Sequence, residues 1–430
     1  SIALLKPDSN AICKPKPALD SSHYSLVLDD RVGEEHQRQQ GDCQRLLAVT
    51  KREQTFRFTG ISEKPVPSLL REFSAPVRLY YDYSIDDLLL LLRADDDGFV
   101  RWDASRRLVL ALITAQLESG AACRENASTD SGDANCAAYC DALASLLAID
   151  VLDDPTTDLA LSAEIVRLPS YAFLVDQLER VDMAQLETAF QSVHDAIRHQ
   201  LHPAFLTAYR HLDARLQALG AYCPDADAIA LRSLKNTLLS YVCDADDEGV
   251  LLAQAQFDNA DNMTDRASAL AALVNASSDV AADHARACLE VFFSQYADES
   301  LVVNQWFSVQ AGSRRADCYE RVVALQSHPA YDATNPNKVR ALIGAFSMRN
   351  LPQFHRRDGA GYRLLADEVL RLDSINPQLA ARLLTPLTQW QKYADSYRAG
   401  MCTQLERIAA APALSTDVYE VVSKSLAMVG

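Results

Sequence analysis

The chain has 430 residues, of which 49% are hydrophobic and 23% charged, the proportions of a soluble globular protein with more than one core. Its net charge of −17 would repel nucleic acid phosphates, which argues against DNA or RNA binding. The leucine run at residues 88–92 is far shorter than the roughly 18 apolar residues that a membrane span needs, and no other apolar run approaches that length, so no membrane segment is predicted.

The first 83 residues predict a β-sandwich domain. Residues 24–28, 55–58 and 75–83 are short runs rich in aromatic and β-branched residues, and the last two alternate apolar and polar positions. Turn residues separate these runs, as in a sandwich of short strands. The charge supports a boundary near residue 83, because residues 1–83 hold 12 basic and 11 acidic side chains, which leaves 29 basic and 47 acidic ones for the rest.

Residues 84–430 predict a large α-helical superhelix. Ser84 can cap a first helix, Asp103 a second, and Asp182 with Gln185 resembles a capping box. About a dozen helical patterns follow, with breaks expected at residues 168–170 and 202–203, and no strand pattern interrupts them. Serial helices with short connections and no strict repeat predict stacked hairpins that wind into a solenoid. The predicted fold class is therefore mostly α, with a small immunoglobulin-like sandwich at the N-terminus.

The usual motifs of catalytic and metal sites are weak or absent. Ten cysteines are too sparse for a disulfide scaffold, so buried free thiols in a reducing compartment are predicted. His194, His199 and His202 lack the spacing of a helical zinc site and are interpreted as surface or capping residues. The acidic run at residues 95–97 lacks the pattern of a calcium loop and is interpreted as a helix-ending turn.

Two helix starts near the C-terminus are unusually well defined. Asn335-Pro336 and Asn376-Pro377 each place a capping residue before a proline at the first helical position. Gln378 and Arg382, one turn apart on the second helix, can reach toward the same point, although a solvated helix face is the simpler interpretation. The predicted buried positions are Val339, Leu342, Ile343 and Phe346 on the first helix and Leu379, Leu383, Leu387 and Trp390 on the second, with a kink at Pro386.

The same region resembles a known family. Residues 335–340 (NPNKVR), 354–362 (FHRRDGAGY) and 376–382 (NPQLAAR) are similar, in order and spacing, to the C-terminal helical domain of bacterial-type aminopeptidase N, a zinc metallo-aminopeptidase of the gluzincin family. Further similar segments are residues 53–56 (EQTF), 65–70 (PVPSLL), 71–77 (REFSAPV) and 99–104 (FVRWDA). The first three resemble the small immunoglobulin-like domain that precedes the helical domain in that family.

This resemblance implies the non-catalytic part of a zinc aminopeptidase, a hydrolase that removes N-terminal residues from peptides. It implies that Arg340, Gln378 and Arg382 line the substrate cavity, with Gln378 near the pocket for the first side chain of the peptide. No histidine in the chain is followed by glutamate, so the H-E-x-x-H zinc motif is missing. We therefore expect no cofactor and no catalytic or metal-binding residue in this chain, with zinc bound by a separate catalytic domain.

The expected partners are peptides and the catalytic domain of the same polypeptide, and not nucleic acid or membrane. A cytoplasmic location is favoured because free thiols are expected. An alternative, from another functional class, is a stand-alone helical-repeat scaffold or modulator that binds a protein partner on its concave face.

Overall fold

The computed structural model describes residues 2–5, 25–27, 46–59, 64–122 and 130–427. Its N-terminal region contains two antiparallel strand pairs, β1 (Ile2–Leu5) with β4 (Val66–Leu69) and β2 (Ser25–Val27) with β3 (Arg57–Thr59). Pro65 precedes β4 and Pro67 lies within it, opposite Leu4 of β1, yet the strand pairs along its length, with Val66 and Ser68 buried. The short 3-10 turn η1 (Arg71–Phe73) follows.

The rest of the described chain is helical. The first helices are α1 (Ile85–Ala94), α2 (Gly98–Ala122), α3 (Asp130–Leu146), α4 (Ile149–Leu152), α5 (Leu159–Val166), α6 (Tyr171–Gln177), α7 (Met183–Ala218) and α8 (Ala226–Cys243). They are followed by α9 (Asp247–Asn259), α10 (Met263–Asn275), α11 (Asp279–Tyr296), α12 (Ser300–Ala311), α13 (Cys318–Leu325), α14 (Pro336–Val339), the π-helical turn η2 (Arg340–Gly344) and α15 (Ala345–Arg349). The last are α16 (Leu351–Phe354), α17 (Ala360–Asp373), α18 (Pro377–Leu383), α19 (Thr385–Thr388), the 3-10 turn η3 (Trp390–Lys392), α20 (Asp395–Ala409) and α21 (Thr416–Ala427).

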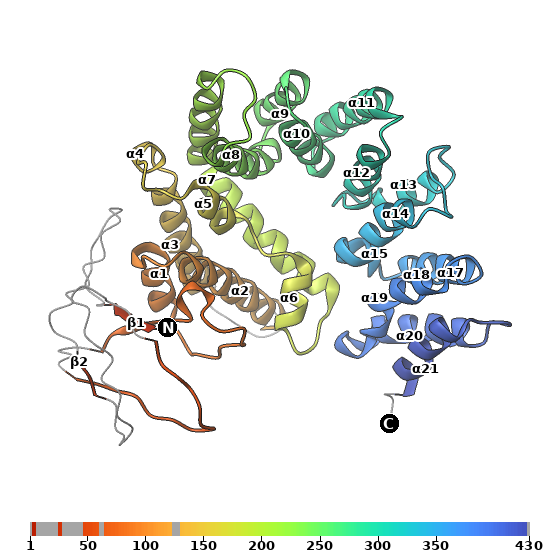
Figure 1. The fold of residues 1–430 in the computed structure, drawn as a ribbon, viewed down its shortest axis with the longest axis horizontal. Coiled ribbons are helices and arrows are strands. Elements are labelled where there is room, and N and C mark those ends of the chain that lie inside the picture. Colours follow the sequence, from red (N-terminus) through yellow and green to blue (C-terminus); the bar gives the residue numbers. More distant parts are fainter. Residues whose placement is uncertain (1, 6–24, 28–45, 60–63, 123–129, 428–430) are drawn as a thin grey trace.

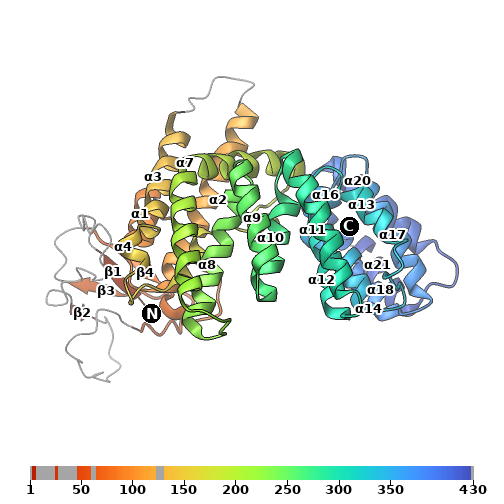
Figure 2. The same cartoon turned by 90° about the horizontal axis from the view of Figure 1, so that it is seen from above.

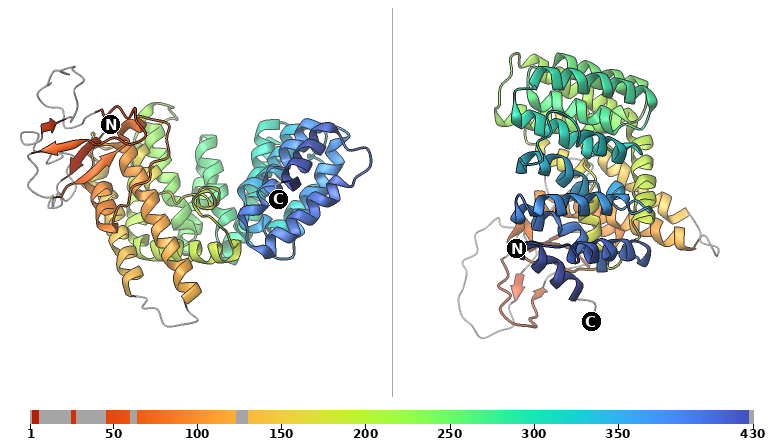
Figure 3. Two further views of the ribbon diagram at one scale, coloured as in Figure 1. Left: turned by 90° about the horizontal axis from the view of Figure 1, so that it is seen from below. Right: turned by 90° about the vertical axis from the view of Figure 1, so that its right-hand side faces the viewer.

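These helices stack along an arc, which confirms the predicted superhelix. Figure 1 shows the arc running from α1 through α8 and α10 to α17 and α21. In Figures 2 and 3 the strands lie at one end of this arrangement and the C-terminus at the other. One continuous apolar core runs through it, from Val66 of β4 to Val422 of α21.

The junction between α6 and α7 contacts the C-terminal helices across a long stretch of sequence. The Val181 amide donates to the Lys392 carbonyl at 2.8 Å, and the Ala394 amide donates to the Val181 carbonyl at 2.8 Å. The Tyr397 hydroxyl accepts from the Ala184 amide at 3.0 Å. In addition α6 contacts α15, and α7 contacts α16. The α6–α7 junction therefore closes the superhelix into a ring.

An acidic turn connects the N-terminal region to the helices. The predicted helix-ending turn at residues 95–97 is present, and it receives the buried guanidinium of Arg71. Arg71 donates to Asp95 at 2.8 Å and to Asp96, while the Glu72 amide donates to Asp97 at 2.8 Å. Burial raises the pKa of the Asp95 carboxyl. This turn thus binds η1 through the Arg71 side chain and the Glu72 amide.

The predicted strand at residues 75–83 is wrong. This segment begins with a bend at residues 75–77 and forms no strand in the described part of the chain. Its carbonyl groups at Leu79 and Tyr81 instead accept hydrogen bonds from Arg107 of α2, at 3.1 and 3.3 Å. An arginine on the helical surface thus satisfies backbone groups that the alternating pattern had suggested for a sheet.

Two predicted helix boundaries are also wrong. Asp97, not Asp103, begins the second helix, because its carboxylate accepts from the Val100 amide at 2.9 Å. Asp103 lies inside α2 and pairs with Arg107. The expected break at residues 202–203 is absent, since α7 continues through Pro203. Leu201 and Phe205 on either side are buried, and this packing outweighs the cost of an interior proline, roughly 3 kcal/mol.

Candidate functional site

The helix that carries Arg340 begins at the predicted cap. The Asn335 side chain accepts from the Asn337 amide at 2.9 Å, and Pro336 occupies the first turn. The predicted apolar positions of this helix are buried, which confirms its inner face. Arg340 itself is exposed, and its guanidinium donates to the Asn337 side chain at 3.2 Å.

Directly at Arg340 the helix widens into the π-helical turn η2. Ser308 of α12 fixes this turn, because its hydroxyl donates to the Ala341 carbonyl at 3.0 Å. π-Helical turns are frequent at functional sites, where they shift the register of the side chains that follow. The sequence did not predict this turn.

Gln378 and Arg382 lie together on the exposed face of α18. Asn376 caps the helix by accepting from the Leu379 amide at 3.0 Å, and the predicted apolar positions of the inner face are buried. The predicted interruption near Pro386 is present, because α18 ends at Leu383 and α19 begins at Thr385. Within the described residues neither the Gln378 nor the Arg382 side chain has an internal hydrogen-bond partner.

Arg340 belongs to a neighbouring element. A methyl group placed on Gly344 of η2 would lie 4.0 Å from the Leu383 side chain of α18, so the two elements approach each other at this point. The structure therefore brings Gln378 and Arg382 to one helix face and Arg340 to the adjoining helix. Their role in lining a substrate cavity stays a prediction.

The two ends of the segment at residues 354–362 lie in the interior of this region, whereas Arg357 and Asp358 in its middle are exposed. The His355 ring is 3% exposed, accepts or donates a hydrogen bond at Nδ1 with the Tyr362 hydroxyl at 2.8 Å, and stacks on Tyr393 at 4.1 Å. Burial lowers the pKa of His355 to about 3. Gly361 is required sterically, since a Cβ there would lie 2.2 Å from the Phe354 carbonyl oxygen.

The histidines interpreted as surface residues differ from one another. His199 is exposed, and His202 contacts Asp246 at 3.1 Å. His194, however, is buried between Phe190 and Tyr241, and burial lowers its pKa, so the surface interpretation is wrong for this residue. The sequence signal was available, because His194 follows Phe190 by four residues and precedes Ile197 by three, the spacing of one helix face.

The predicted buried thiols are confirmed at four positions. The buried cysteines are Cys140, Cys243, Cys288 and Cys318; Cys223 is exposed, and Cys136 and Cys402 are half-buried. The described residues contain no group of three His, Cys, Asp or Glu side chains that could hold a metal ion. They also contain no helix with the length and apolar character of a membrane span.

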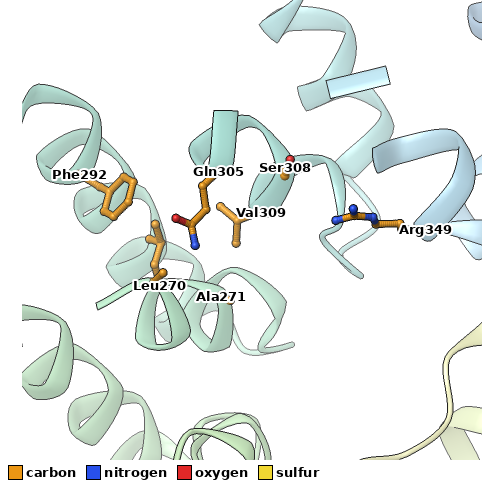
Figure 4. Close-up of a pocket in the computed structure, with 8 residues that line it drawn as sticks. Leu270, Ala271, Phe292, Gln305, Ser308, Val309 and Arg349 are labelled. Atoms are coloured by element: carbon orange, nitrogen blue, oxygen red, sulfur yellow. The ribbon is translucent and has the colours of Figure 1, made fainter. Parts of the chain in front are cut away.

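A pocket near η2 adds residues that the sequence did not suggest. Its volume is about 230 Å³, and Arg349 at the end of α15 lies at its edge (Figure 4). Arg349 is exposed and follows Arg340 by nine residues on the same continuous helix. No motif marks Arg349 or the other lining positions, because they come together only through packing of separate helices.

The chain matches two family descriptions in the order that its fold suggests. Residues 25–82 match a domain of unknown function (DUF3458) with an Ig-like fold. Residues 85–427 match a domain of unknown function (DUF3458_C) with ARM repeats. An Ig-like domain followed by a helical-repeat domain is the predicted fold class.

Among curated proteins the chain is similar to three enzymes named aminopeptidase N. It is 33% identical over 389 residues to that of Haemophilus influenzae, covering 89% of this chain and 41% of the relative. The corresponding values are 35% over 382 residues, 89% and 42% for Caulobacter vibrioides, and 32% over 411 residues, 94% and 44% for Escherichia coli. The chain thus spans less than half the length of these relatives.

A solved structure supports the same relationship. The crystal structure of Legionella pneumophila aminopeptidase A in complex with aspartic acid shares 31% identity with this chain at a TM-score of 0.73. The similarity covers 87% of this chain and 43% of that one. The chain therefore belongs to the DUF3458_C family and corresponds to a C-terminal portion of bacterial-type aminopeptidase N, an Ig-like domain followed by a helical ARM-repeat domain.

Proposed function

We propose that this chain is the non-catalytic part of a zinc-dependent aminopeptidase, in which it shapes the substrate cavity and controls the access of peptides. The relatives named aminopeptidase N support the reaction class, and their greater length leaves room for a catalytic domain that this chain does not cover. In this proposal Arg340, Gln378 and Arg382 face the peptide.

The proposal rests on two polar side chains of α18 that are exposed and make no internal hydrogen bond in the described part of the chain. Gln378 and Arg382 are exposed, one turn apart, on a helix fixed by an asparagine cap and an N-terminal proline. They have no internal partner among the described residues, although the chain as a whole is strongly acidic. A guanidinium in this position can donate two parallel hydrogen bonds to a peptide carbonyl or carboxylate, and a glutamine amide can donate or accept one.

Zinc chemistry is assigned to the part of the relatives that this chain does not cover. The chain has no H-E-x-x-H motif, and its described residues offer no metal-binding group, so the zinc-dependent step would take place in the catalytic domain. We expect the purified chain to bind no stoichiometric zinc and to release no alanine from a fluorogenic alanyl substrate. Release that a chelator abolishes would contradict this expectation.

The cavity role is tested by Arg382→Ala in a polypeptide that joins this chain to its catalytic domain. We expect kcat/KM for peptides of four to six residues to fall about tenfold or more, because a charge-assisted hydrogen bond contributes roughly 1.5–3 kcal/mol. Hydrolysis of a single-residue alanine anilide should change less than about twofold, since it lacks the peptide groups that Arg382 would contact.

Arg286→Ala is the matched control, because Arg286 is an exposed arginine of α11 paired only with the exposed Asp283. An unchanged preference for peptides in the Arg382 variant would contradict the cavity role. The stand-alone scaffold would then be the better interpretation of the ring.

A further inference from the structure

The pocket beside η2 is built from four helices that meet in the middle of the arc. Figure 4 shows its side chains, with Arg349 extending from α15 toward Val309 of α12. The lining residues are Ala267, Leu270 and Ala271 of α10, Phe292 of α11, Gln305, Ser308 and Val309 of α12, and Arg349 of α15.

The size and the lining of the pocket favour a small apolar group. Leu270 and Phe292, each 1% exposed, close the inner side of the pocket, and the half-buried Val309, Ala267 and Ala271 provide most of its accessible apolar surface. A volume of about 230 Å³ lies below the roughly 300–1,000 Å³ of pockets that hold drug-sized ligands and cofactors. The pocket therefore suits a single side chain and not a whole cofactor.

The polar groups at the pocket favour an anion beside that apolar group. Arg349 is exposed, and within the described residues it contacts no carboxylate and has no hydrogen-bond partner. More than half of the described arginines do contact a carboxylate, as expected in a chain of net charge −17. The Gln305 amide is likewise exposed without an internal partner in the described part.

Ser308 restricts the ligand further. Its hydroxyl proton is committed to the Ala341 carbonyl at 3.0 Å, so its oxygen can only accept from a ligand. The pocket thus offers a cationic donor, an amide, and one hydroxyl acceptor around an apolar surface. A carboxyl-terminal residue has the matching groups, namely a carboxylate, a backbone N–H and a side chain.

We infer that this pocket binds the carboxyl-terminal residue of a peptide that ends in an aliphatic side chain. The aliphatic group lies against Leu270, Phe292 and Val309, and Arg349 binds the terminal carboxylate through charge-assisted hydrogen bonds. The choice of a peptide as ligand rests on the proposed function. The pocket would hold the end of the peptide opposite to the one that is cleaved, and it would favour peptides with a free, aliphatic C-terminus.

The test measures binding of N-acetyl-Ala-Ala-Leu to the 430-residue chain by titration calorimetry or by NMR. We expect this free acid to bind at least tenfold more tightly than its C-terminal amide and than N-acetyl-Ala-Ala-Gly. The amide lacks the charge that Arg349 recognises, and the glycine peptide lacks the apolar group.

Two pocket variants and one control assign the binding to the pocket. Arg349→Gln should weaken binding of the free acid about tenfold or more and abolish the preference for the acid over the amide. Arg286→Gln removes one charge from the same acidic chain away from the pocket and should leave binding unchanged. Ala271→Phe should block binding by filling the cavity, and circular dichroism checks that each variant is folded.

Three outcomes would overturn the inference: no binding of the free acid, equal binding of acid and amide, or an unaffected Arg349→Gln variant. Because the acetyl group blocks the N-terminus and the chain alone is used, none of these outcomes depends on peptidase activity. Failure of the proposed function would appear in the Arg382→Ala kinetics, and failure of this site would appear here.

Discussion

At the scale of single residues, burial determines the chemistry of the ionisable groups in the C-terminal helices. His355 is surrounded by Tyr362 and Tyr393, and its Nε2 atom has no hydrogen-bond partner in the described residues. Burial keeps its ring neutral and lowers its pKa to about 3. Burial also lowers the pKa of the Lys338 ammonium group, which lies over the ring of Phe307. Arg340, two residues after Lys338, is exposed. Two basic residues of one motif therefore lie in opposite environments, Lys338 buried and Arg340 exposed to solvent.

The buried His355 predicts a loss of stability in mild acid. The native state keeps the ring neutral down to about pH 3, whereas the unfolded chain takes up a proton below its ordinary pKa of about 6.5. Proton binding by the unfolded chain therefore lowers the free energy of unfolding as the pH falls from about 6.5 toward 3. The decrease is at most about 1.4 kcal/mol per pH unit. Between pH 7 and pH 5, the parent chain should lose up to about 2 kcal/mol more unfolding free energy than His355→Gln.

The measurement is urea unfolding of both proteins at the two pH values. Comparing the differences cancels other acid-sensitive groups such as His194, whose pKa burial also lowers. Equal losses in the two proteins would show that His355 does not remain neutral in the folded chain.

At the scale of elements, most helix starts follow from short capping motifs. Ser84 and Asp87 form the complete capping box of α1, and Asp182 caps α7 through the amides of Ala184 and Gln185. These contacts need only residues two or three positions apart, so the sequence predicted them correctly. The interior of a helix is different, because packing against other helices can override a local breaking signal. Pro203 in α7 is the clearest instance.

Pro203→Ala should stabilise the chain. Pro203 is exposed, so little packing is lost, and alanine restores a backbone donor in the middle of α7. We expect the free energy of unfolding to rise by about 1–3 kcal/mol, measured by chemical denaturation. Pro169→Ala is the comparison, since Pro169 lies in the real break before α6, where loss of a rigid residue should cost about 0.4–1 kcal/mol, and loss of packing at this buried position adds to that cost. If both substitutions changed the free energy of unfolding in the same direction, this explanation would be contradicted.

At the scale of the whole molecule, the ring is closed by contacts between residues more than 130 positions apart. The bridge between Val181 and Tyr393 and the hydroxyl of Tyr397 join the start of α7 to the turn before α20. The ion pair between Arg180 and Asp395 is exposed and contributes little. Closure therefore rests mainly on a few backbone hydrogen bonds and on the contacts of α6 and α7 with α15 and α16.

Tyr397→Phe should loosen this closure without unfolding the ring. It removes one acceptor of the Ala184 amide, a loss of about 0.5–1.5 kcal/mol. Hydrogen exchange of the Val181 and Ala394 amides should become about 2–12 times faster, whereas the amides of α8 to α10 keep their rates. Tyr419→Phe, at an exposed tyrosine, should change the exchange rates of neither set of amides. A uniform change along the whole chain would argue against a local joint.

The sequence by itself determined the helix caps, the apolar inner faces, the order of a small β domain before a helical superhelix, and the family. Each depends on residues close together in the chain or on short motifs in a fixed order. Only the tertiary structure decided the fate of residues 75–83, the binding of Arg71 by the acidic turn, the ring closure, and the pocket around Arg349. These features depend on which helices meet in space, and one-dimensional periodicity does not contain that information.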